Sequence, residues 1–192
     1  MRKQAFESVL QAAGVDLEWR FTLFLRNEVL SMAKSPKISK TNAVRLLDQQ
    51  NVSYDLFEYE VNDGKIDGVS VAHKIEQPVE KVFKTLVATA GPGKVFVFLV
   101  PVAQELNLKA AAKAAEEKKV EMLPVKDLLG LTGYIRGGCS PLGMKKLFPT
   151  FIDDTAQILD TMIVSAGKIG MQIHLEPSDL MTCTQGTYAV LT

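Results

Sequence analysis

The order of apolar and polar positions predicts helices and strands in alternation along the first part of the chain. Apolar residues at helical spacing, preceded by Ser39 as a capping residue, predict a helix that ends near Gln50. A strand-like run follows at residues 52–61, and a turn-rich segment at residues 63–68 leads to a further helix at residues 70–75. These patterns place the first strand between two helices.

A hairpin of two apolar strands is the clearest element that the pattern predicts. The first strand contains residues 82–86, Val-Phe-Lys-Thr-Leu, the chain turns at residues 91–94, and it returns through residues 95–100. The returning run is apolar almost throughout, which is typical of a central strand covered on both faces. Lys84 is therefore expected in a strand beside a central one, on the same face as Leu86.

The second half of the sequence predicts shorter elements around two turns. They are an alanine-rich helix at residues 105–118, a short strand at residues 120–122, a helix that begins at Pro124, and a helix opened by residues 176–180. Strands near residues 159–164 and 171–175 are expected to complete the sheet. Residues 132–143 form a glycine-rich loop, and residues 164–170 close a second hairpin. A glycine-rich loop can bring backbone N–H groups close to a ligand.

Lys84 is the first candidate for a functional side chain. Its strand position directs it among the apolar residues Val82, Leu86 and Ala88. A buried ammonium is costly unless it meets an anion, lowers its pKa or reaches water. The lysine therefore marks either a binding or catalytic position or an edge strand that keeps the charge in water.

Four motifs in order resemble a known family. They are Phe-Lys-Thr-Leu at residues 83–86, Thr-Gly-Tyr-Ile-Arg-Gly-Gly-Cys-Ser-Pro-Leu-Gly at residues 132–143, Ser-Ala-Gly-Lys-Ile-Gly at residues 165–170 and Glu-Pro-Ser-Asp-Leu at residues 176–180. Together they resemble the YbaK/EbsC family of free-standing aminoacyl-tRNA deacylases, relatives of the editing domain inserted in bacterial prolyl-tRNA synthetases. The resemblance spans residues 39–185, with Ala166 where the family has a glycine. It implies an α+β fold, a single domain in which helices surround a central mixed β-sheet, with a pocket between the sheet and the glycine-rich loop.

The resemblance also implies which residues form the site. The family's glycine-x-x-x-proline loop corresponds to residues 137–141, its pocket lysine to Lys84, its pocket aspartate to Asp179 and its strand tyrosine to Tyr59. The expected catalytic residues are Lys84, Gly137, Gly138 and Cys139, and the expected substrate-binding residues are Tyr59, Lys84, Ser140, Pro141, Ser165, Gly167 and Asp179.

The activity implied by the resemblance is trans-editing, the removal of cysteine from mischarged Cys-tRNA(Pro). In this mechanism the substrate's own cysteinyl thiol attacks its ester carbonyl and releases tRNA and a cyclic thioester. The backbone amides of residues 137–139 are expected to bind the carbonyl oxygen as charge develops, and Lys84 to hold the terminal adenosine phosphate or the carbonyl region. Asp179 is expected to anchor the substrate's α-ammonium or the lysine, and Tyr59 to form a pocket wall or offer its hydroxyl.

Three other functions stay open at this point. A sister activity hydrolyses Ala-tRNA(Pro) or another small aminoacyl ester with a bound water, and an inactive domain only binds tRNA or a synthetase. Cys139 with His73 or His174 would make a cysteine hydrolase, although neither histidine lies in a recognisable partner motif. An isolated cysteine is more often a small buried hydrophobic residue.

Composition limits the kinds of partner. The 192 residues are 47% hydrophobic, enough for a buried core in one domain, and the formal net charge of zero excludes a strongly basic nucleic-acid binder. Contact with tRNA therefore needs a local patch, for which the candidates are Lys109, Lys113, Lys118, Lys119, Lys126, Arg136, Lys145 and Lys146. The first four also fit a solvated helix face. Two cysteines without metal-ligand spacing predict neither a disulfide framework nor a zinc site, and no cofactor is expected.

The sequence also predicts the domain limits and the compartment. Residues 1–38 lie outside the resemblance and are expected to be an N-terminal extension, with Met32 as an alternative start, while residues 39–192 form the deacylase domain. The absence of a signal-like segment and of a long apolar run predicts a cytoplasmic protein without membrane contact. The expected partners are the acceptor end of aminoacyl-tRNA and, as an open alternative, prolyl-tRNA synthetase.

Overall fold

The computed structural model describes residues 40–192, so the predictions for residues 1–38 lie outside the described part of the chain. The strands are β1 (Asp55–Glu58), β2 (Phe83–Gly91), β3 (Lys94–Pro101), β4 (Glu121–Met122), β5 (Thr150–Asp153), β6 (Met162–Ser165), β7 (Met171–Leu175) and β8 (Thr187–Ala189). The helices are α3 (Asn42–Gln50), α4 (Gly68–Lys74), α5 (Leu108–Ala114), α6 (Val125–Thr132) and α7 (Pro177–Thr184), with short 3-10 helices η1 (Val79–Lys81) and η2 (Asp154–Ile158).

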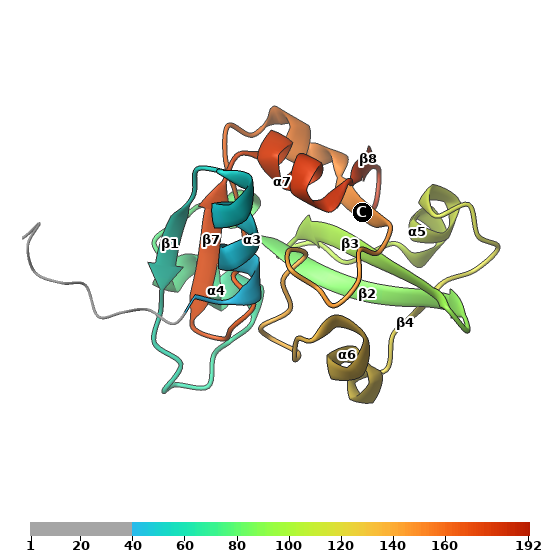
Figure 1. Ribbon diagram of the computed structural model, residues 1–192, viewed down its shortest axis with the longest axis horizontal. Helices are drawn as coiled ribbons and strands as arrows, with labels where there is room; N and C mark the ends of the chain where they lie inside the picture. Colours follow the sequence, from blue (N-terminus) through green and yellow to red (C-terminus); the bar gives the residue numbers. More distant parts are fainter. Residues whose placement is uncertain (1–39) are drawn as a thin grey trace, which may run out of the picture. The chain divides into compact units, whose positions relative to one another are not determined.

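The strands form two sheets (Figure 1). The five-stranded sheet has the order β4-β2-β3-β5-β8 and is mixed, because β5 runs parallel to both of its neighbours. The antiparallel strands β1, β7 and β6 form the second sheet, in that order. The expected mixed sheet with surrounding helices is thus confirmed. However, β6 and β7 do not complete the central sheet as predicted, since they pair with β1.

The β2–β3 hairpin is the centre of the larger sheet. Its antiparallel register pairs Lys84 with Val100 and Leu86 with Phe98, and β3 is buried from Val95 to its end. The buried central strand and the position of Lys84 in the strand beside it, on the same face as Leu86, are therefore confirmed. The short strands β5 and β8 were not predicted, because they are defined by pairing with distant segments and not by a pattern of their own.

The two faces of the hairpin pack against different parts of the chain. On one face, Phe96, Phe98 and Val100 contact the small side chains Ala111 and Ala112 of α5. Alanines there allow the helix to lie close to the sheet. Lys84 belongs to this same face by strand alternation, while Thr85 and Val87 belong to the opposite one.

A second cluster of buried residues joins the two sheets. Val71 and Ala72 of α4 pack against Val82 at the start of β2 and Ile163 of β6. Val82 and Ile163 also form an isolated parallel bridge between the sheets. The beginning of β2 is consequently fixed to the smaller sheet.

Side-chain caps explain where two helices begin. Thr41 caps α3, since its hydroxyl accepts a hydrogen bond from the Val44 N–H at 3.2 Å, whereas the sequence predicted Ser39 as the cap. Asn107 caps α5, so this helix begins at Leu108. It ends at Ala114 and is therefore shorter than the helix expected at residues 105–118. Within residues 40–192, none of the helices is long and apolar enough to cross a membrane.

Candidate functional site

A cavity of about 370 Å³ lies between β2, the glycine-rich loop, the segment around α4 and the β6–β7 hairpin. Its volume is at the lower end of the range for small-molecule sites. Most of the wall is apolar, with Val71, Val82, Val87, Leu123 and Leu128 among the lining residues. Besides the thiol of Cys139, polar side chains reach it from Tyr59, Lys84, Thr85, Arg136, Ser165 and Gln172. The cavity therefore combines an apolar wall with a few polar groups, as binding sites do.

The cavity brings together half of the site residues expected from the sequence. Tyr59, Lys84, Gly137, Cys139 and Ser165 all line it. Tyr59 directly follows β1, Lys84 lies in β2, the next two belong to the glycine-rich loop and Ser165 ends β6. Three of the four motifs, at residues 83–86, 132–143 and 165–170, thus meet at one place in the fold.

Only part of the expected oxyanion site is available in the glycine-rich loop. The Gly138 N–H donates to the Ile135 carbonyl at 3.0 Å, so this amide is engaged within the loop. Gly138 also packs closely, because a Cβ there would lie 3.1 Å from the Ile169 nitrogen. Within residues 40–192, the N–H groups of Gly137 and Cys139 donate to no backbone carbonyl in the turns and loops. These two N–H groups are the candidate donors.

Three other expected residues shape the loop and do not line the cavity. Ser140 is fully buried, and its hydroxyl accepts from the Leu142 N–H at 3.2 Å; Pro141 is buried beside it. Gly167 has a φ of +88°, and a Cβ there would lie 2.6 Å from the ring of Tyr134. The buried Tyr134 hydroxyl donates to the Leu142 carbonyl at 2.7 Å, so this ring holds the loop beside the β6–β7 hairpin.

Lys84 is half-buried, and its ammonium forms an ion pair with an exposed glutamate. Its Nζ lies 2.9 Å from Oε1 of Glu105, a residue whose side chain is 91% exposed. An ion pair with so exposed a carboxylate is weak, because water competes for both charges. The lysine can therefore exchange this partner for an anionic group of a ligand.

Asp179 does not reach the cavity. It lies in the first turn of α7, as the sequence predicts. Burial of the Cys183 thiol raises the pKa of that thiol, and the negative charge of Asp179 adds to the rise. Neither Asp nor Glu is among the cavity's lining residues. The structure thus pairs Lys84 with Glu105 instead of Asp179. Within the described residues, no three His, Cys, Asp or Glu side chains gather as ligands for a metal ion.

Thr85 and Gln172 are cavity residues that sequence reasoning missed. Gln172 is buried, with an exposed fraction of 6%, and it lies opposite Ser165 in the β6–β7 register. A polar residue between the apolar Met171 and Ile173 is a detectable signal once the hairpin register is known. Thr85 gave no such signal, because a threonine is ordinary in a strand.

Cys139 lines the cavity but is not activated as a nucleophile. Burial raises the pKa of its thiol to about 12, so the thiolate is scarce near neutral pH. Neither His73 nor His174 lines the cavity. His174 instead lies 3.5 Å from Asp55, measured from Nδ1 to Oδ2. The arrangement needed for a cysteine hydrolase is absent from the described part of the chain.

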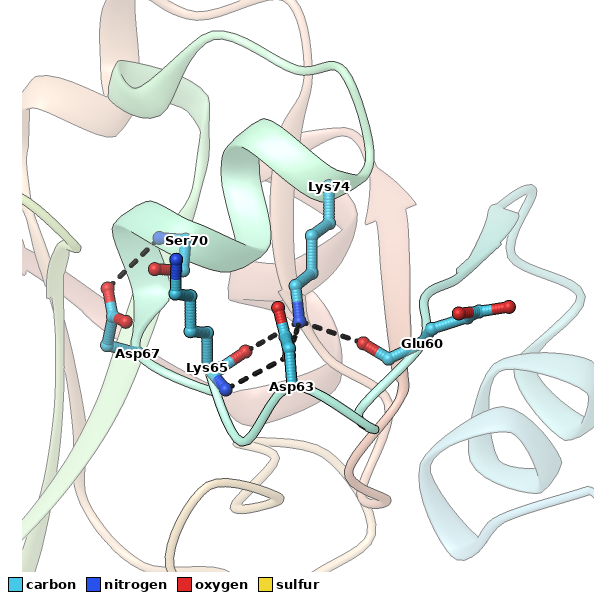
Figure 2. Close-up of polar contacts among 6 residues, drawn as sticks. All are labelled: Glu60, Asp63, Lys65, Asp67, Ser70 and Lys74. Carbon is cyan, nitrogen blue, oxygen red and sulfur yellow. Dashed lines mark hydrogen bonds and ion pairs between the residues drawn. The ribbon is translucent and has the colours of Figure 1, made fainter.

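The segment between β1 and α4 forms another wall of the cavity, and Lys74 holds it in place (Figure 2). The Lys74 ammonium donates to the carbonyls of Glu60 and Lys65 at 2.8 and 2.9 Å and pairs with Asp63 at 2.5 Å. This hydrogen bond lowers the pKa of Asp63. The segment carries Ile66, which lines the cavity beside Gly137.

Comparison with known proteins identifies the family. A family model described as the aminoacyl-tRNA editing domain matches residues 67–183. The chain belongs to this family. EbsC of Enterococcus faecalis, named as a candidate Cys-tRNA(Pro)/Cys-tRNA(Cys) deacylase, is 46% identical over 161 residues, which cover 84% of this chain and 98% of EbsC. The resemblance seen in the four motifs is thereby confirmed.

Two solved structures share the fold of this editing domain. One, described as a candidate trans-editing enzyme for prolyl-tRNA synthetase, has a TM-score of 0.72 at 20% identity, covering 82% of this chain and 99% of that chain. The other, a hypothetical protein designated APE2540, has a TM-score of 0.72 at 16% identity, covering 79% and 99%. At these identities the likeness supports the fold alone.

Proposed function

We propose that this protein is a trans-editing aminoacyl-tRNA deacylase that removes cysteine from mischarged Cys-tRNA(Pro). The observation that carries the proposal is the convergence of Lys84, Gly137 and Cys139 on one small cavity in an aminoacyl-tRNA editing domain. The relationship to EbsC supports the choice of substrate.

In this proposal the protein supplies electrostatics and orientation. The N–H groups of Gly137 and Cys139 donate to the ester carbonyl oxygen as it becomes negative, and Lys84 leaves Glu105 for the phosphate of the terminal adenosine or the carbonyl region. The apolar wall excludes water and so strengthens these interactions. Arg136, which also lines the cavity, adds a second cation near the phosphate.

The attacking group belongs to the substrate. Cys139 holds its proton because of burial, and the Ser165 hydroxyl accepts from the Gly167 N–H at 3.3 Å without a base beside it among the described residues. The cysteinyl thiolate therefore attacks its own ester carbon: a C–S bond forms, the C–O bond to the terminal ribose breaks, and that oxygen takes up a proton. The products are free tRNA and a cyclic thioester.

Mischarged proline tRNA comes from prolyl-tRNA synthetase, so we place the activity beside that enzyme in the cytoplasm. Physical association with the synthetase is a separate part of the proposal. Co-sedimentation of the two purified proteins, with and without tRNA(Pro), tests it.

The decisive experiment measures deacylation of purified Cys-tRNA(Pro), Ala-tRNA(Pro) and Pro-tRNA(Pro). We expect cysteinyl-tRNA to be cleaved fastest and the cyclic thioester to be found by mass spectrometry. Faster cleavage of Ala-tRNA(Pro) would show water-dependent hydrolysis of the sister type. Binding of tRNA without turnover of any substrate would show a binding module and contradict the proposal.

A further inference from the structure

The edge of β2 is open where it passes the cavity. The Leu123 N–H donates to the Val87 carbonyl at 2.9 Å, so the backbone groups of Val87 face β4. Backbone groups alternate along a strand, and those of Thr85 therefore face the same edge. The pairing of β4 with β2 covers only Ala88 and Thr89. Within residues 40–192 nothing pairs with the Thr85 N–H and C=O at this edge.

Two buried hydroxyls at the same cavity also lack partners. The oxygens of Tyr59 and Thr85 are buried and make no hydrogen bond within the described residues. Tyr59 as a whole is only 9% exposed. A buried polar group without a partner costs free energy, so each of these hydroxyls calls for a partner that the described residues do not supply.

The charges of the cavity narrow the chemistry of that ligand group. An aminoacyl ester carries an α-amino group, which is a hydrogen-bond donor with several N–H bonds. No carboxylate lines the cavity to receive it, and the charged residues there are the cations Lys84 and Arg136. Neutral oxygen acceptors are therefore the groups available for the amino nitrogen.

We propose that the hydroxyls of Tyr59 and Thr85, together with the open Thr85 carbonyl, bind the α-amino group of the aminoacyl ester. This inference rests on the proposed function and assigns the part of the substrate for which the sequence predicted Asp179, a residue that does not line the cavity. Its consequence is a selection for free aminoacyl groups. In peptidyl-tRNA and other N-acylated esters, the nitrogen has fewer N–H bonds to donate and carries a bulky acyl group. We therefore expect the protein to leave these esters intact.

The test compares two substrates that differ only in the amino group. They are cysteinyl-tRNA(Pro) and 3-mercaptopropionyl-tRNA(Pro), which keeps the thiol but lacks the amine. Each rate is divided by the spontaneous rate of the same ester, because the amine also changes intrinsic reactivity. We expect the protein to accelerate the cysteinyl ester at least about tenfold more than the desamino ester, as loss of a few hydrogen bonds implies.

Variants then assign the preference to particular oxygens. Thr85→Val and Tyr59→Phe, which keep the size of each side chain, should each reduce the preference about threefold to tenfold, and Thr85→Ser should retain it. Thr89→Val is the matched control on the same strand, since the Thr89 hydroxyl donates to carbonyls of the hairpin turn and lies outside this cavity. It should keep the preference of the unmodified protein.

The outcomes separate this inference from the proposed function. Equal acceleration of the two esters, or an undiminished preference in both Thr85→Val and Tyr59→Phe, would overturn the inference and leave the deacylase function standing. Failure of the unmodified protein to cleave either ester would overturn both. Circular dichroism of each variant shows whether its fold is intact, and a variant that does not fold is replaced by Thr85→Ala or Tyr59→Leu.

Discussion

At the scale of single residues, Lys84 joins two properties that were alternatives in the sequence. It lies in the hairpin that forms the core, and it keeps its ammonium at the surface by pairing with Glu105. The exposed carboxylate gives the lysine a resting partner that a substrate phosphate can replace. The residue is therefore both an edge lysine and a candidate site group.

Replacement of Lys84 with alanine tests its role. The change removes a charged donor from the cavity, and losses of about 2 to 4 kcal/mol in transition-state stabilisation are usual for such groups. We expect kcat/KM for Cys-tRNA(Pro) to fall by about a hundredfold with the fold intact. Glu105→Gln is the matched control, because it breaks the same ion pair but keeps the lysine, and it should retain most activity. Near-normal turnover by the alanine variant would remove Lys84 from the mechanism.

Cys139 provides a second test at this scale. In the proposed mechanism it contributes its backbone N–H, which alanine retains, so Cys139→Ala should keep most deacylation activity. Seryl-tRNA(Pro) should be a poor substrate, because a hydroxyl is ionised far less than a thiol near neutral pH. Loss of activity in the variant combined with fast cleavage of seryl-tRNA would show an enzyme nucleophile instead.

At the scale of elements, the cavity is formed by segments that other residues hold in place. Tyr134 fixes the glycine-rich loop, and Lys74 fixes the wall between β1 and α4 (Figure 2). The pKa of Asp63 is lowered in the folded state, mainly by its hydrogen bond with Lys74. The stability that this contact adds is therefore present above the usual aspartate pKa and is lost as the pH falls through the lowered value. This wall is therefore held in place at neutral pH.

Lys74→Met should loosen this wall without touching the substrate. It removes the donor to two carbonyls and to Asp63, and we expect KM to rise about fivefold with a smaller change in kcat. Lys65→Met is the matched control: it changes an exposed lysine of the same segment whose ammonium has no described partner. Equal kinetics of the two variants would show that Lys74 does not position the wall.

At the scale of the whole molecule, charge is balanced in total but not in distribution. Lys84, Lys94 and Lys119 are each paired with a glutamate. By contrast, the basic residues of α6, the glycine-rich loop and the segment after it have no ion pair among the described residues; they are Lys126, Arg136, Lys145 and Lys146. Arg136 lines the cavity. Local positive charge of this kind is the form of tRNA contact that a neutral chain allows.

Salt titration of tRNA binding tests this distribution. Four phosphate contacts predict a slope of log K against log salt of about −3, from 0.7 to 0.9 per contact. Replacing Arg136 or Lys146 with alanine should reduce the slope by about one contact each. Alanine at Lys109 and Lys113 together serves as the control and should leave the slope unchanged. Affinity that does not respond to salt would mean that phosphates are not bound.

The sequence by itself determined the family, the central hairpin, the face of Lys84 and the acidic first turn of α7, because each depends on a local motif or on strand and helix periodicity. Tertiary structure decided the rest. It separated the strands into two sheets, engaged the Gly138 amide within its loop and kept Asp179 away from the cavity. It also brought Thr85 and Gln172 into the site. Hydrogen-bond partners and cavity walls come from segments far apart in the chain, and no local pattern specifies which distant group will meet a given residue.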